Sequence, residues 1–109
     1  MKERYYIEVD GKPVPTEDQE AVNAMIGSPH RTVAKTLLHD DTVEVSTVFL
    51  VLNHAFDGGT PVLYETLVFG GPLDGDGTRY CFRDEAFEGH QEWVRKAADA
   101  KPTEEDPNA

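Results

Sequence analysis

The sequence predicts an α+β fold in which an antiparallel sheet of four to five strands packs against two helices. Two segments with apolar residues at helical spacing flank a run of short segments rich in β-branched residues. The turns between these short segments are too brief to hold a crossover helix, which favours antiparallel pairing. We expect the order β-α-β-β-β-β-α in a single domain over residues 1–100. Both helices are expected on one face of the sheet, and one helix on each face is the alternative.

The first strand is expected over residues 4–9, which are rich in aromatic and β-branched residues and end at the turn dipeptide Asp10-Gly11. Residues 12–15 are expected to be extended or irregular. Their two prolines fix φ and remove two backbone donors.

The first helix is expected to begin at Thr16, which has capping-box spacing with Gln19. An apolar stripe at helical spacing follows and Gly27 ends it. The stripe consists of Ala21, Val22, Met25 and Ile26.

Three strands are expected in the middle of the chain, over residues 30–38, 43–52 and 62–69. The second of them is the most apolar, as expected of a central strand. Turn sequences separate the strands at residues 40–42, 53–61 and 70–72.

A polar, glycine-rich loop over residues 73–78 leads to a short fifth strand over residues 79–82 and then to a helix over residues 84–100. Six residues form the apolar face of that helix. They are Ala86, Phe87, His90, Trp93, Val94 and Ala97. Residues 101–109 contain little that a core can bury, so we expect a disordered acidic tail.

Charge is the strongest global feature of the sequence. Ten Lys and Arg oppose 21 Asp and Glu in 109 residues, a formal net charge of −11. This balance argues against direct binding to nucleic acid and against adhesion to anionic membranes, and it favours a partner protein with a basic surface. No apolar run is long enough to span a bilayer, and no signal-peptide core follows the first residues, so we expect a protein of the bacterial cytoplasm.

A candidate polar binding site consists of His54, Glu65, Arg79, Tyr80 and His90. Glu65 alternates with apolar residues of its expected strand, so it is predicted to point toward the core, where a carboxylate needs a partner. Arg79, His54 or His90 is the expected partner. A buried ion pair or hydrogen bond that serves only the fold explains the same pattern.

Metal, cofactor and nucleophile motifs give little support for catalysis. The four histidines, His30, His39, His54 and His90, lack the close spacing of a zinc motif. Ser46 has no nucleophile elbow around it, and Cys81 is expected to be a small core or sheet residue. We therefore expect no catalytic residue, metal or cofactor.

The loop at Asp74 partly matches a calcium loop. Asp74, Asp76, Thr78 and Glu85 occupy the first, third, fifth and twelfth positions. The sixth position holds Arg79 where the motif requires glycine, and a strand precedes the loop instead of a helix. A surface turn is the preferred interpretation.

Four short motifs carry a resemblance. They are VSTVFLVLNH at residues 45–54, FDGGTPVLYET at 56–66, RY at 79–80 and AFEGH at 86–90. In this order they resemble a family of small uncharacterised bacteriophage and prophage proteins, over residues 31–93. The chain departs from the family pattern at Val51, Asn53, Thr60 and Cys81. Asn53 replaces an aspartate, which weakens a metal or acid–base role there.

The resemblance implies a phage setting, in which small acidic proteins often act by occupying a host protein. Our first hypothesis is a non-enzymatic, phage-encoded acidic protein that binds a host or phage protein, for example as an inhibitor of a host-defence or nucleic-acid-handling complex. The alternative is a ligand- or metal-binding protein, with or without enzymatic activity, whose site lies around His54, Glu65 and His90. A third hypothesis is a homo-oligomeric component of an assembly.

Overall fold

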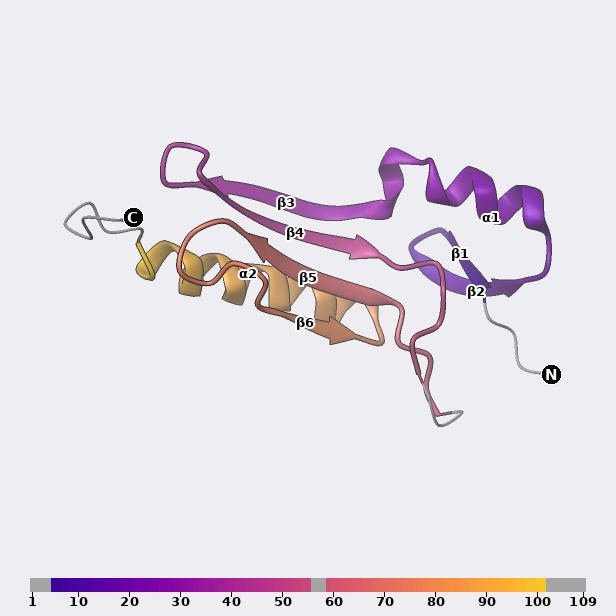
Figure 1. Ribbon diagram of the computed structural model, residues 1–109. Helices are drawn as coiled ribbons and strands as arrows, with labels where there is room; N and C mark the ends of the chain where they lie inside the picture. Colours follow the sequence, from indigo (N-terminus) through magenta and orange to yellow (C-terminus); the bar gives the residue numbers. More distant parts are fainter. Residues whose placement is uncertain (1–4, 56–58, 102–109) are drawn as a thin grey trace.

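A computed structural model describes residues 5–55 and 59–101, and it confirms an antiparallel α+β fold (Figure 1). The elements in chain order are β1 (Tyr5–Val9), β2 (Lys12–Thr16), α1 (Gln19–Ile26), the 3₁₀ turn η1 (Pro29–Arg31), β3 (Thr32–Leu38), β4 (Val43–Phe49), β5 (Tyr64–Phe69), β6 (Gly77–Tyr80) and α2 (Arg83–Asp99). The strands form two sheets, a β1–β2 hairpin and a four-stranded sheet of order β3-β4-β5-β6. The predicted single sheet is therefore divided in two.

The N-terminal hairpin contains a strand, β2, over residues that were predicted to be extended or irregular. Asp10 and Gly11 both have positive φ, 53° and 77°, as a two-residue hairpin turn requires. Pro13 and Pro15 pair with Glu8 and Tyr6 in β1. Because the two prolines lie two residues apart, their missing N–H groups fall on the same edge of β2, the open edge without a neighbouring strand.

Helix α1 begins later than predicted. Asp18, not Thr16, is the N-cap, and its carboxylate accepts from the backbone N–H groups of Glu20 and Ala21. The Thr16 hydroxyl accepts from the Asp18 N–H instead. The helix packs on β1 and η1, whereas we expected it on the main sheet. Its buried Val22 joins the core that lies beyond the end of β4.

The four-stranded sheet has one covered and one open face. Side chains of β4 alternate between buried and half-buried along its whole length, and α2 contacts all four strands. We call the face that α2 covers the inner face. It carries the buried residues Val43, Val45, Thr47, Phe49, Tyr64, Thr66 and Val68. Among the described elements, no helix covers the opposite, outer face (Figure 1).

A tight turn connects the sheet to the hairpin. The Leu52 N–H donates to the Leu50 carbonyl at 2.7 Å across Val51, whose φ is 70°. This is a γ-turn with a strained centre, because a β-branched residue rarely adopts positive φ. The Val51 side chain is buried, and its carbonyl accepts from the Tyr6 N–H at 2.7 Å. The turn therefore holds β1 against the end of the sheet.

Helix α2 is anchored at its start by Glu85, whose carboxylate accepts from the backbone N–H groups of Cys81 and Phe82. Ala86, His90 and Ala97 are buried, as predicted for the apolar face, but Phe87 is 50% exposed. Phe87 therefore does not belong to the core. No helix within residues 5–55 and 59–101 is long and apolar enough to cross a membrane.

Three predictions lie partly or wholly outside the described residues. They are Arg4 in the first strand, the Asp57-Gly58 part of the turn at 53–61, and the acidic tail, of which only Lys101 is described.

Candidate functional site

Glu65 and Arg79 form an ion pair on the outer face of the sheet. They lie opposite each other on β5 and β6, and Arg79 Nε donates to Glu65 Oε2 at 3.1 Å. The prediction that Glu65 faces the core is wrong. Side chains of a strand alternate between the two faces, and its neighbours Tyr64 and Thr66 are the ones that point inward. The inward residues of β5 are Tyr64, Thr66 and Val68. The predicted partnership of Glu65 with Arg79 is present, but on the open face.

His90 and Tyr80 belong to a different, buried network on the inner face. Tyr80 Oη donates to Thr66 Oγ1 at 3.2 Å, and the hydroxyls of Thr66 and Thr47 lie 2.5 Å apart. Thr47 Oγ1 lies 2.8 Å from His90 Nδ1, and His90 Nε2 lies 2.9 Å from Thr36 Oγ1. One chain of hydrogen bonds thus crosses the sheet from β6 to β3 through the helix.

Two proton arrangements of a neutral ring satisfy this network, and Tyr80 donates to Thr66 in both. In the first, Thr47 donates to Nδ1 and Nε2–H donates to Thr36; in the second, Nδ1–H donates to Thr47 and Thr36 donates to Nε2. The ring is then neutral, in agreement with burial lowering the pKa of His90. Because both ring nitrogens already have partners, His90 has no free lone pair for a metal or a substrate proton.

His54 lies apart from both groups, in the loop after β4. Its Nδ1–H donates to the Leu52 carbonyl at 2.7 Å. The neighbouring Asn53 accepts from the backbone N–H groups of Ala55 and Val62 at 2.8 and 3.0 Å. Asn53 therefore has a structural role, which an aspartate can also perform.

The five predicted site residues thus occupy three separate places, and His54, Glu65 and His90 do not meet. No group of three or more metal-ligating side chains occurs in the described part of the chain. The calcium-like spacing has a local explanation, since Asp74 accepts from the Gly70 N–H and Thr78 from Trp93 Nε1. Burial and the Glu85 carboxylate raise the pKa of the Cys81 thiol, which disfavours the reactive thiolate.

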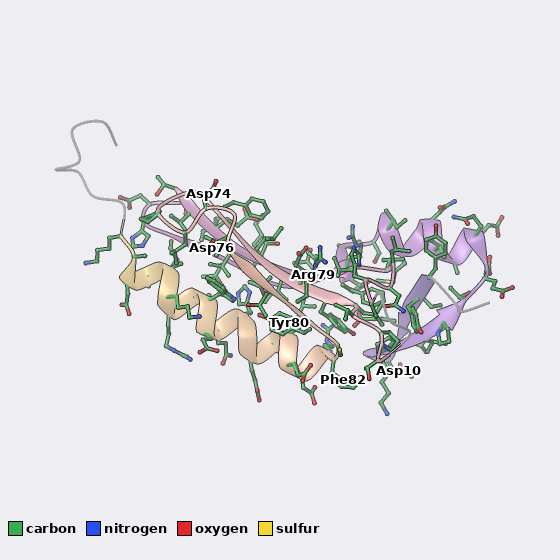
Figure 2. The ribbon with its side chains drawn as sticks, turned by 60° about the horizontal axis from the view of Figure 1, so that its bottom comes forward. Asp10, Asp74, Asp76, Arg79, Tyr80 and Phe82 are labelled. Carbon is green, nitrogen blue, oxygen red and sulfur yellow. The ribbon has the colours of Figure 1, made fainter. Side chains whose placement is uncertain are left out.

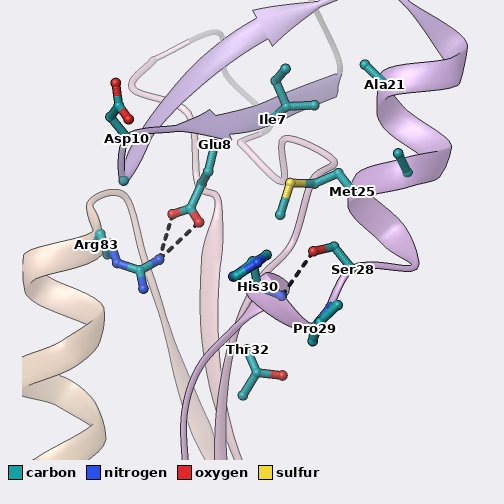
Figure 3. A pocket seen from close by; sticks show the side chains of 12 residues that line it. Ile7, Glu8, Asp10, Ala21, Met25, Ser28, Pro29, His30, Thr32 and Arg83 are labelled. Carbon is teal, nitrogen blue, oxygen red and sulfur yellow. Dashed lines mark hydrogen bonds and ion pairs between the residues drawn. The ribbon is translucent and has the colours of Figure 1, made fainter.

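A sizeable cavity lies elsewhere, between the hairpin, α1 and the start of α2 (Figure 3). Its volume is about 830 Å³. One wall is apolar and consists of Ile7, Ala21, Ala24 and Met25. The opposite side is polar and includes Glu8, Asp10, Ser28, His30, Thr32 and Arg83.

An ion pair between the two parts of the fold forms the wall of this cavity. Arg83 Nη1 donates to both carboxylate oxygens of Glu8 at 3.0 and 2.9 Å, and Tyr64 Oη donates to Glu8 Oε2 at 2.6 Å. The Glu8 side chain is only 8% exposed. Burial, and next the Glu8 carboxylate, raise the pKa of Tyr64 well above its ordinary value.

The pairing of Glu8 with Arg83 was not predicted from the sequence, although the position of Arg83 in the sequence indicates that it needs a partner. A cation in the first turn of a helix opposes the macrodipole. Arg83 at the first position of α2 therefore indicated a partner from elsewhere in the fold.

Two smaller hollows adjoin the large cavity, and all three are lined by Arg83. We call the surface around it the Arg83 junction, which consists of Asp10, Lys12, Phe82, Arg83, Asp84, Phe87 and Glu88. Phe82 is 55% exposed and Phe87 50%, so the junction presents two open aromatic rings. Figure 2 shows Asp10 close to Phe82 beside the start of α2, and Asp74 and Asp76 well away from them, toward the other end of that helix.

Comparison with known proteins adds no identification. No family model, no curated protein and no solved structure matches this chain.

Proposed function

We propose that this protein is a non-enzymatic binding protein whose Arg83 junction holds a basic, partly apolar segment of a partner protein. One observation carries the proposal. Two exposed aromatic side chains, Phe82 and Phe87, lie beside three exposed carboxylates at a place where three hollows meet. The three carboxylates belong to Asp10, Asp84 and Glu88.

The charges of the junction favour a basic partner. Glu8 neutralises Arg83, so three carboxylates remain against the ammonium of Lys12. The chain as a whole carries −11, which adds long-range attraction to a cationic surface. Aromatic side chains in hollows are the usual anchors of protein interfaces, and the surrounding charges give specificity.

The buried polar groups of the interior are already engaged with one another, which argues against a catalytic site there. Within the described residues, every buried side-chain nitrogen and oxygen has a hydrogen-bond partner. His90 is 4% exposed and bonded at both ring nitrogens. The resemblance to small phage proteins supports a setting in the cytoplasm of a bacterial host, where the partner is a host or phage protein with a basic surface, such as a nucleic-acid-handling complex.

A labelled peptide of alternating lysine and leucine residues serves as the probe, with binding followed by fluorescence anisotropy. The junction variant carries Asp10→Asn, Asp84→Asn and Glu88→Gln. The matched control carries Asp40→Asn, Asp41→Asn and Asp76→Asn, which remove three charges from the β3–β4 turn and the loop before β6, away from the junction (Figures 1 and 2). Asparagine tolerates the positive φ of Asp10, Asp40 and Asp41, so both variants are expected to fold.

We expect the junction variant to bind the peptide about tenfold more weakly and the control less than about threefold more weakly. Binding should also weaken between about 0.1 M and about 1 M salt, as the Debye length falls from about 10 Å to about 3 Å. Equal weakening in the two variants would show that total charge alone attracts the peptide, and the proposal would fail.

The apolar part of the site has its own test. Phe82→Ser with Phe87→Ser should weaken peptide binding, whereas Leu37→Ser with Phe69→Ser should not. Leu37 and Phe69 are similarly exposed, at 47% and 49%, but lie on the outer face of the sheet.

A further inference from the structure

The outer face of the four-stranded sheet carries apolar side chains that no described helix covers. The register places Leu37, Val48, Leu67 and Phe69 on this face, opposite in phase to the buried residues. Leu37 and Phe69 flank Glu44 in one row across β3, β4 and β5, and each is about half exposed. An antiparallel sheet can leave one face in water, but such a face is then usually polar.

The charges on this face are balanced, unlike those of the whole molecule. Lys35 Nζ lies 3.9 Å from Glu44 Oε1, and Arg79 pairs with Glu65 at 3.1 Å. Two cations and two anions leave the face without net charge, whereas the chain carries −11. Two copies of an acidic protein repel each other least where their facing surfaces are neutral.

Mixed charges also make the face complementary to itself. A two-fold axis brings the same surface of each copy together, so cations and anions of one copy can meet their opposites on the other. Sheets pack face to face at about −30° with interleaved side chains about 10 Å apart. Phe69 and Leu37 are then the side chains best placed to interleave.

The size of the face suits a weak dimer. Four strands about 4.8 Å apart and about six residues long span roughly 400 Å² per copy, and side-chain relief enlarges this area. The flat area of two copies totals roughly 800 Å², below the limit of about 1,000 Å² for a specific stable interface, and this size fits a weak, reversible dimer.

We propose that two copies of this protein associate through their outer faces into a reversible two-fold dimer. The occupant of the face is a second copy because the surface is apolar and electrically neutral, whereas a basic partner is attracted to the carboxylates elsewhere. The dimer leaves the Arg83 junction open, since α2 and β1 lie away from the outer face (Figures 1 and 2). This proposal does not rest on the proposed function.

Sedimentation equilibrium of the full chain, from about 1 μM to about 1 mM, tests the proposal. The wild-type protein should shift from monomer to dimer within this range. Leu37→Ser with Phe69→Ser should raise the dimer dissociation constant about tenfold or more, and Phe82→Ser with Phe87→Ser should leave it within about threefold. Circular dichroism verifies that both variants are folded.

A monomer at every concentration would overturn the dimer. Equal effects of the two double variants, or a stronger effect at Phe82 and Phe87, would overturn the assignment to the outer face. The same two variants have opposite expected results in the peptide assay, so each proposal can fail separately.

Discussion

The inner face of the sheet and the Arg83 junction use polar groups in opposite ways. On the inner face, Thr36, Thr47, Thr66 and His90 are buried or half-buried and bonded to one another. At the junction, the carboxylates of Asp10, Asp84 and Glu88 are exposed and lie next to open aromatic rings. A cluster of polar side chains is therefore not enough to identify a binding site.

The two regions differ in whether their polar groups still have donors or acceptors free to bind a ligand. A buried group whose donors and acceptors are all paired stabilises one arrangement of the fold and has nothing left for a ligand. An exposed carboxylate gains little from its own protein but can pair with a cation from outside. The segments 46–54, 64–66, 79–80 and 85–90 contribute Thr47, Thr66, Tyr80 and His90 to the first kind of region.

The largest effect on stability is expected from Thr47→Val. The change keeps the shape but removes the hydroxyl between Thr66 and His90, which leaves buried polar atoms without a partner. We expect a loss of about 2–3 kcal/mol in the free energy of unfolding, measured by urea denaturation. Ser46→Ala, one residue away on the outer face, should change it by less than about 0.5 kcal/mol. Similar losses in the two variants would show that the hydrogen-bond network around Thr47 does not stabilise the fold.

The next largest effect is expected from Gly89→Ala in α2. Alanine normally stabilises a helix by about 1 kcal/mol relative to glycine. At Gly89, however, an added Cβ overlaps the Tyr80 ring and hydroxyl. We expect a net loss of about 1–2 kcal/mol instead. In a Tyr80→Ala background the same substitution should become stabilising, and a stabilising effect in the wild-type background would contradict the close packing.

A pH dependence should follow from His90. Its pKa is lowered by burial from the ordinary value of 6.5, so the unfolded chain takes up the proton first as the pH falls. The contribution of His90 to stability is complete above pH 6.5 and decreases below it, by up to about 1.4 kcal/mol per pH unit until the lowered pKa is reached. Urea denaturation between about pH 8 and pH 5 measures this slope, which His90→Asn should reduce. A wild-type slope equal to that of the variant would assign the effect to other groups.

The smallest effect on stability is expected at the junction. Phe82 and Phe87 are about half exposed, so replacing both with serine should change the free energy of unfolding by no more than about 1 kcal/mol. The same double variant should nevertheless weaken peptide binding. A large loss of stability would instead place these rings in the core and exclude them as free anchors.

Much of the fold could be predicted, because turn sequences and β-branched segments specify local structure. The Asp10-Gly11 turn and the four central strands follow from such signals. Strand β2 was missed because Pro13 and Pro15 argue against a strand unless one edge is open, and an open edge is a property of the tertiary structure.

The candidate site could not be predicted in the same way. Strand β5 has apolar residues in both phases, with Leu67 and Phe69 outward and Tyr64 and Val68 inward, so hydrophobicity did not fix the direction of Glu65. The Arg83 junction combines residues from the β1–β2 turn, from β2 and from the start of α2, which are some 70 positions apart in the chain. The Glu8–Arg83 ion pair joins the hairpin directly to the start of α2.

The central claim is that binding takes place at the Arg83 junction, and NMR titration of the ¹⁵N-labelled full chain with the lysine–leucine peptide tests it most directly. We predict that the shifted backbone amides cluster in residues 10–12 and 82–88, while those of residues 39–42 and 70–76 at the opposite acidic end stay unchanged. Shifts confined to the opposite end, or spread evenly over all acidic residues, would contradict the account.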